Sequence, residues 1–105
     1  MAILPRIYFH LDELEEPVKR VEQEFSPDVV RIKYTFDEDW TGDPSIFFRI
    51  LLSDSAARMK RRREVSPRIK ERLREEVKPE DLGVHAYFNV RSASEQAELN
   101  DPDWA

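Results

Sequence analysis

Alternating hydrophobic and polar residues predict three strands in this chain. The positions expected to face a core are Val30, Ile32, Tyr34 and Phe36 in the first segment, Ile46, Phe48, Ile50 and Leu52 in the second, and Val84, Ala86, Phe88 and Val90 in the third. A two-residue period is that of a strand with one face buried and the other face open. Only a polar turn over 37–44, with Gly42 and Pro44, separates the first two segments, so we expect them to form an antiparallel hairpin.

The N-terminal part of the chain has the hydrophobic spacing of an amphipathic helix. Hydrophobic residues recur every three or four positions over 7–25. Pro17 interrupts this pattern, because proline lacks the backbone N–H that an interior helical turn uses. It either kinks a long helix or stands in the first turn of a shorter helix over 17–25. We favour the shorter helix, which leaves residues 6–11 available as an additional strand.

A second amphipathic helix is predicted between the second and third strands. Val65, Ile69, Leu73 and Val77 fall at intervals of four residues and form a narrow apolar stripe. Ser66 and Pro67 provide an N-cap and a first-turn proline, so the helix either starts there or begins near Lys60 and is kinked. The basic residues around the stripe give this helix a strongly charged surface.

The order helix, strand, strand, helix, strand predicts an α+β two-layer sandwich, in which a small, mainly antiparallel sheet packs against two helices. A length of 105 residues fits a single domain over 1–105. We expect the ends to be flexible over 1–5 and 93–105. The C-terminal segment is polar and acidic, and it allows at most a short helix before an irregular end over 101–104.

The composition narrows the class of protein. Charged residues make up 37% of the chain and hydrophobic residues 40%, and average globular chains contain about 25% charged residues. No apolar run approaches the ~18 residues of a membrane span, and the N-terminus lacks the pattern of a signal peptide. We therefore expect a cytoplasmic protein that does not enter a membrane. The chain has no cysteine, which excludes disulfides, thiol catalysis and cysteine-ligated metal centres.

The outer face of the predicted sheet is the first candidate site. It would contain Arg31, Lys33, Thr35, Phe47, Arg49, Leu51, His85, Tyr87, Asn89 and Arg91. Phe47, Leu51 and Tyr87 would form a contiguous exposed apolar patch, which predicts contact with another protein or with a second copy of this chain. Trp40, in the turn between the first two strands, either covers the core or anchors a contact. The candidate partner-binding residues are therefore Phe47, Arg49, Leu51, Tyr87, Arg91 and Trp40.

The net charge of −5 is unevenly distributed along the chain. Ten of the 17 Lys and Arg residues lie within 58–78, together with only four acidic residues. Glutamates at i,i+4 spacing balance part of this charge, but not that of Arg61–Arg63. Such a density of cations can neutralise several phosphates. The alternative function is therefore nucleic-acid binding through the basic helix over 58–74 and the outer sheet face, with Arg61, Arg62, Arg63, Arg68, Arg31 and Lys33 as the candidate residues.

Little in the sequence supports catalysis or ligand binding. The acidic residues Asp37, Glu38, Asp39, Asp43 and Asp54 offer the oxygen ligands that Mg²⁺ and Ca²⁺ prefer, but their spacing does not match a calcium-binding loop. Aspartates are also common turn residues. The two histidines, His10 and His85, lie in different elements, and the chain lacks a phosphate-binding glycine loop, a nucleophile elbow and a His-Glu-x-x-His motif. We predict no enzymatic activity, metal, cofactor or small-molecule substrate.

The segment Asp39–Leu52, which reads Asp-Trp-Thr-Gly-Asp-Pro-Ser-Ile-Phe-Phe-Arg-Ile-Leu-Leu, resembles a segment of short bacterial proteins of uncharacterised function. The resemblance extends to Asp54 and to Leu82–Val90, about half of the chain, and it implies no activity and no functional residue. Small acidic bacterial proteins often act as accessory or antitoxin-like partners of another gene product, which is an argument by analogy. We therefore predict a non-enzymatic protein–protein interaction module, either self-associating or accessory to another protein.

Overall fold

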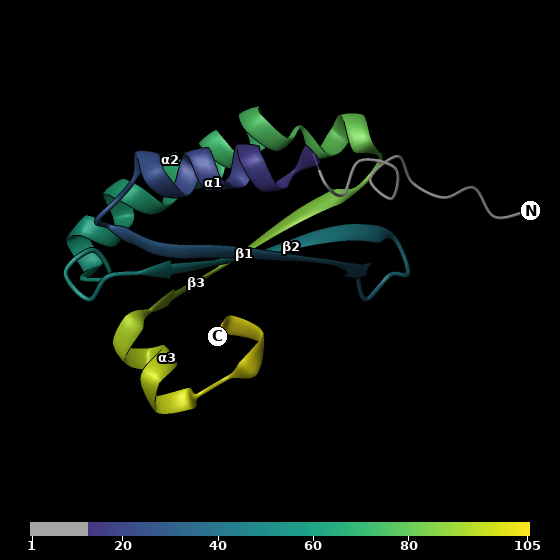
Figure 1. Ribbon diagram of the computed structural model, residues 1–105. Coiled ribbons are helices and arrows are strands. Elements are labelled where there is room, and N and C mark those ends of the chain that lie inside the picture. Colours follow the sequence, from purple (N-terminus) through teal and green to yellow (C-terminus); the bar gives the residue numbers. More distant parts are fainter. Residues whose placement is uncertain (1–12) are drawn as a thin grey trace, which may run out of the picture.

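The computed structural model describes residues 13–105, in which two helices cover one face of a three-stranded sheet (Figure 1). The elements are α1 (Glu15–Glu24), β1 (Val29–Glu38), β2 (Pro44–Leu52), α2 (Met59–Val77), η3 (Pro79–Leu82), β3 (His85–Ser92), α3 (Ala93–Leu99) and η4 (Pro102–Trp104). This arrangement confirms the predicted α+β two-layer sandwich. The additional strand considered over 6–11 lies outside the described residues. Within them, no helix has the length and apolar character needed to cross a bilayer.

β2 is the central strand of the sheet, with β1 and β3 at the two edges. β1 pairs with β2 in the antiparallel direction, which confirms the predicted hairpin. β3 pairs with β2 in the parallel direction, so the sheet is mixed rather than mainly antiparallel. The reason is that α2 carries the chain back along the sheet before β3 begins, as a parallel connection requires.

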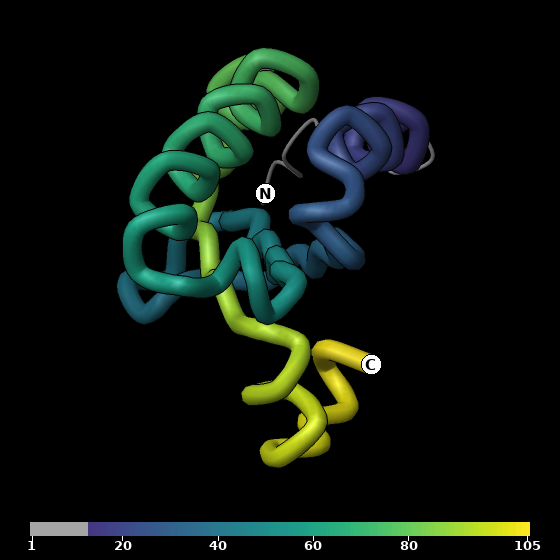
Figure 2. Tube along the Cα trace, turned by 90° about the vertical axis from the view of Figure 1, so that its left-hand side faces the viewer, coloured from purple at the N-terminus to yellow at the C-terminus, as the bar shows by residue number. Residues whose placement is uncertain are grey.

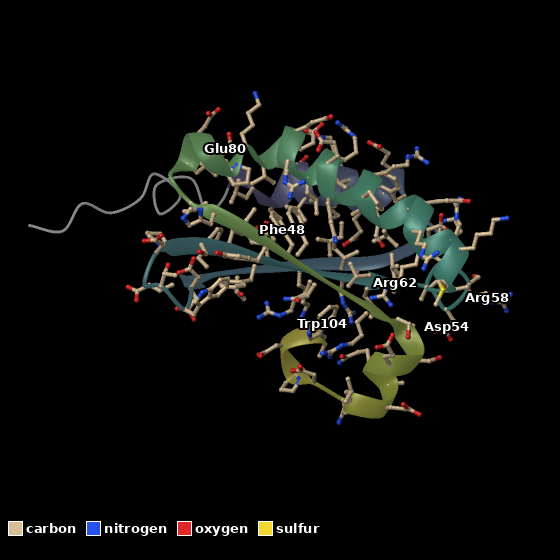
Figure 3. All side chains as sticks on the ribbon, turned by 180° about the vertical axis from the view of Figure 1, so that it is seen from behind. Phe48, Asp54, Arg58, Arg62, Glu80 and Trp104 are labelled. Atoms are coloured by element: carbon tan, nitrogen blue, oxygen red, sulfur yellow. The ribbon has the colours of Figure 1, made fainter. Side chains whose placement is uncertain are left out.

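The core lies between the sheet and the two long helices. The stripe predicted on α2 is buried along its whole length, from Val65 to Val77, and α1 adds Val18 and Val21. Phe48 of β2 is fully buried and points from the sheet toward the helices (Figure 3). Burying these apolar side chains is the main favourable contribution to folding in so small a chain.

The two prolines occupy different parts of their helices. Pro17 is the third residue of α1 and lies in its first turn, where the backbone N–H groups have no partner within the helix. α1 therefore begins just before Pro17 instead of being a longer helix kinked there. Pro67 lies inside α2, which begins at Met59. The buried neighbours Val65 and Ile69 hold the helix on the core on both sides of this proline.

Val30 faces the opposite way from the prediction. We expected it to point into the core, but its side chain is 49% exposed and that of Val29 is buried. The pairing register shifts between Val29 and Arg31. Such a β-bulge places one extra residue in the strand. The predicted alternation holds from Ile32 onward, because the bulge is confined to the start of β1.

The C-terminal residues fold back beneath the sheet, on the face opposite α1 and α2 (Figures 1 and 2). α3 is the short helix that the sequence allowed, and it begins with a capping box between Ser92 and Glu95. The end of the chain is not irregular as predicted. It forms η4, in which the Asp101 side chain accepts a hydrogen bond from the backbone N–H of Asp103 at 3.0 Å.

Candidate functional site

The strand register places the predicted outer-face residues side by side. Three rows cross the sheet, which are Thr35–Phe47–Tyr87, Lys33–Arg49–Asn89 and Arg31–Leu51–Arg91. Side chains in the same row of a sheet are direct neighbours. The outer face therefore has an aromatic end, at the first row, and an end that carries two arginines and a leucine, at the last.

The C-terminal tail, residues 93–105, covers the end of the outer face that carries the two arginines and the leucine. Trp104 is only 6% exposed. The guanidinium of Arg91 lies 4.3 Å from the centre of its ring, and Arg31 donates a hydrogen bond to its backbone carbonyl at 2.8 Å. Leu51 is 5% exposed. The predicted contiguous exposed patch of Phe47, Leu51 and Tyr87 is therefore wrong, since Leu51 is buried between two arginines that the tail engages.

At the aromatic end of the outer face, Phe47 and Tyr87 are half-buried and Trp40 is exposed. The rings of Phe47 and Tyr87 stack with their centres 5.2 Å apart, and the ring of Trp40 lies 5.3 Å from that of Tyr87. Trp40 is 81% exposed. We call these three side chains the aromatic surface. Arg49, in the next row, is held by a hydrogen bond of 2.9 Å to the hydroxyl of Thr35.

Asp39 fixes the turn that carries Trp40. Its carboxylate accepts hydrogen bonds from the backbone N–H and the hydroxyl of Thr41, from the N–H of Asp43 at 3.1 Å, and from the Tyr87 hydroxyl at 2.7 Å. These bonds, above all that from the Thr41 side chain, hold the pKa of Asp39 below its usual range. The same carboxylate raises the pKa of Tyr87. Gly42 has a φ of +87°, a conformation that favours glycine.

The structure brings only part of the predicted acidic cluster together. Asp39 and Asp43 lie near His85, with one potential ligand atom from each within 4.8 Å of the others. The sequence analysis did not link His85 to the turn, because the parallel pairing that places it opposite Ser45 was not predicted. The oxygens of Asp39 already accept four hydrogen bonds. Asp54 lies apart from this group and accepts hydrogen bonds from Ser94.

The positive charges of the basic helix α2 have more carboxylate partners than we predicted. Arg61, which we expected to lack a counter-charge, pairs with Asp28 at 2.6 Å and with Glu64 at 3.4 Å. The hydrogen bond that Arg61 donates to the Asp28 carboxylate raises the pKa of Arg61. Arg68 lies over the ring of Phe25, 5.6 Å from the ring centre. Among the described residues, Arg63 has no ion-pair partner in the structure.

Arg72 connects α2 to α1. Its guanidinium contacts the carboxylates of Glu24, Glu75 and Glu76. These hydrogen bonds, led by that of Glu24, raise its pKa above the usual range. Arg20 of α1 adds a second link, to Glu76 at 3.3 Å.

The six residues predicted for nucleic-acid binding do not form one surface. Arg61, Arg62, Arg63 and Arg68 belong to α2, on the helix side of the sheet. Arg31 and Lys33 belong to the outer face, and Arg31 is engaged by Trp104. A single strand of nucleic acid would have to pass around the sheet to contact both groups.

The fold and the site together define an α+β sandwich with a half-covered outer face and a projecting aromatic turn. No protein family model, no curated protein and no solved structure matches this chain. The resemblance of Asp39–Leu52 to short bacterial proteins therefore stays a prediction.

Proposed function

We propose that this protein is a non-enzymatic interaction module that binds another protein through its aromatic surface. The observation that carries the proposal is Trp40, a large apolar side chain that is 81% exposed on a turn fixed by Asp39. Tryptophan, tyrosine and arginine are the residues that dominate binding energy at protein interfaces. A contact side chain held in place before binding also costs less conformational entropy when the complex forms.

Because the tail covers one end of the outer face, fewer of the predicted residues are available to a partner. Leu51 and Arg91 were both predicted to bind the partner, but Leu51 is buried and Arg91 is engaged by Trp104 of the C-terminal tail. The partner then meets Trp40, Phe47 and Tyr87, with Arg49 at the border. This surface is apolar at its centre and charged at its border, as interfaces between separately folded proteins usually are.

For the identity of the partner we keep both alternatives that the sequence predicted. It is either a second copy of this chain or a different protein that this chain serves as an accessory. The resemblance of Asp39–Leu52 to short bacterial proteins supports an accessory or antitoxin-like role by analogy, because that segment contains Trp40 and Phe47.

The test is affinity capture from a lysate of the source organism, treated with nuclease. Three baits are compared, namely the wild type, Trp40→Ala and Leu99→Ala. Leu99 is the matched control, since it is a large apolar residue that is 61% exposed and lies outside the aromatic surface. We expect a stoichiometric protein partner with the wild type and Leu99→Ala, and its loss with Trp40→Ala. Equal capture by all three baits would contradict the proposal.

Light scattering distinguishes the two kinds of partner. A dimer mass for the wild type and a monomer mass for Trp40→Ala identify a second copy of this chain. A monomer mass for both leaves a different protein as the partner, which the capture experiment then has to show. A dimer that persists in Trp40→Ala argues that association uses another surface.

A further inference from the structure

The outer edge of β3 carries backbone groups that the sheet does not use. Within residues 13–105, β3 pairs with β2 on one side only. Arg62 donates a hydrogen bond to the Val90 carbonyl at 3.1 Å, so the backbone N–H and C=O of Val90 point away from β2. Because the N–H and C=O of one residue point to the same side of a strand and successive residues alternate, those of Ala86 and Phe88 point the same way as those of Val90. Their N–H groups, and that of Val90, have no acceptor among residues 13–105.

A groove runs between this edge and α2. Its volume is about 710 Å³, and the half-buried Phe88 and Val90 line it from the strand. Arg62, Arg63 and Lys70 line it from the helix, and no acidic residue does. Figure 3 shows Arg62 extending from α2 toward β3. The groove thus combines an unpaired strand edge, an apolar floor and a basic wall.

The basic wall has little internal counter-charge. Neither Arg63 nor Lys70 forms an ion pair within the part of the chain that the structure describes, and the nearest carboxylate to Arg62 is that of Glu95 at 4.0 Å. A separate hollow, which Ala86 lines, is different, since acidic side chains such as Glu71 and Glu80 line it together with Arg74. The positive charge is therefore concentrated at the Val90 end of the edge.

We propose that this groove binds an extended acidic segment of another protein, which adds to β3 as a fourth strand. An added strand hydrogen-bonds to the free backbone groups, and the side chains around the edge determine which residues the added strand can carry. Here the surroundings favour acidic residues beside Arg62, Arg63 and Lys70. A peptide fits better than a nucleic acid, because the free N–H and C=O groups of the edge have the spacing of another strand.

The first experiment measures binding of a fluorescein-labelled peptide of alternating Glu and Val by anisotropy. The test variant is Arg63→Glu/Lys70→Glu. The control variant is Arg58→Glu/Lys60→Glu, which changes the net charge equally on the same helix but outside the groove. We expect the test variant to bind at least about tenfold more weakly than the wild type, a difference of about 1.4 kcal/mol, and the control variant to bind like the wild type. No binding to the wild type, equal weakening in both variants, or stronger binding of an oligothymidylate of the same charge would overturn the proposal.

The second experiment tests strand addition directly. Amide hydrogen exchange is measured by NMR with and without saturating peptide. We expect slower exchange at the N–H groups of Phe88 and Val90, and loss of binding when the peptide is N-methylated at alternate residues. Unchanged exchange at saturation, or full binding of the N-methylated peptide, would show that no strand is added. We expect Trp40→Ala to leave this binding unchanged, because Trp40 does not line the groove, so the result is independent of the aromatic surface.

Discussion

The two tryptophans provide a matched test of the C-terminal cover. Trp104 is 6% exposed and Trp40 is 81% exposed. The same substitution, tryptophan to alanine, therefore removes a buried contact in one case and an exposed ring in the other. If the tail stabilises the fold by docking on the outer face, only Trp104→Ala should reduce the free energy of unfolding strongly.

The size of the effect follows from the burial of Trp104. A tryptophan side chain buries about 200 Å², which at ~25 cal/mol per Å² corresponds to about 5 kcal/mol. Truncation of a buried tryptophan to alanine typically costs about 3–5 kcal/mol. The loss cannot exceed the net docking free energy of residues 93–105, so we expect the lower value of about 3 kcal/mol. Trp40→Ala should change the free energy of unfolding by less than about 0.5 kcal/mol.

The assay is urea denaturation of the wild type and both variants, followed by far-UV circular dichroism. We expect a fall of about 3 kcal/mol for Trp104→Ala, equivalent to about 12 °C or more in melting temperature for a domain of this size. A loss below about 1 kcal/mol for Trp104→Ala, or equal losses for the two variants, would refute the conclusion that the tail is part of the folded domain.

Three further predictions concern the turn, the helix pair and one glycine. Because the native pKa of Asp39 lies below its unfolded value, its contribution to stability is present above about pH 4 and lost as the pH falls below it. Between about pH 5 and pH 2, Asp39→Asn should lose less free energy of unfolding than the wild type. Equal losses would argue against this role. Arg72→Ala should lower the free energy of unfolding and make it less sensitive to added salt, since it removes the ion pair to Glu24 of α1 and the pairs to Glu75 and Glu76 within α2. An unchanged salt dependence would contradict the role of this cluster. Gly83 has a φ of +74° and open space around it. Gly83→Ala should therefore lower the free energy of unfolding by about 1 kcal/mol, and Gly83→Asn by less. Thermal melts in which the alanine variant is as stable as the wild type would show that the backbone is not constrained there.

The sequence was most informative where structure depends on local periodicity. The apolar stripe from Val65 to Val77 and the alternation from Ile32 to Phe36 each depend on neighbouring positions, and both were predicted with the correct buried face. The set of residues on the outer face followed from the same alternation, but their arrangement in rows depends on the pairing register, which the sequence did not predict. Val30 was misassigned because a bulge adds a residue without a sequence signal strong enough to place it.

The features that sequence could not show depend on contacts between distant segments. Leu51 looked exposed because nothing local indicates that Trp104 docks on Arg31 and Arg91, the residues on either side of it. Arg61 looked unbalanced because its partner, Asp28, lies 33 positions away. The proximity of His85 to Asp43 follows from the parallel pairing of β3, which the strand patterns alone do not determine.

The central claim is that Trp40 is buried in a protein contact, and fluorine NMR of protein labelled with fluorotryptophan tests it most directly. The two tryptophans give separate signals, and Trp104, already buried, serves as the internal reference. On addition of the captured partner, or on dimerisation if light scattering shows it, we predict that the Trp40 signal shifts and loses its sensitivity to solvent while the Trp104 signal stays in place. A Trp40 signal that remains fully solvent-sensitive in the saturated complex would place the contact elsewhere and contradict the account.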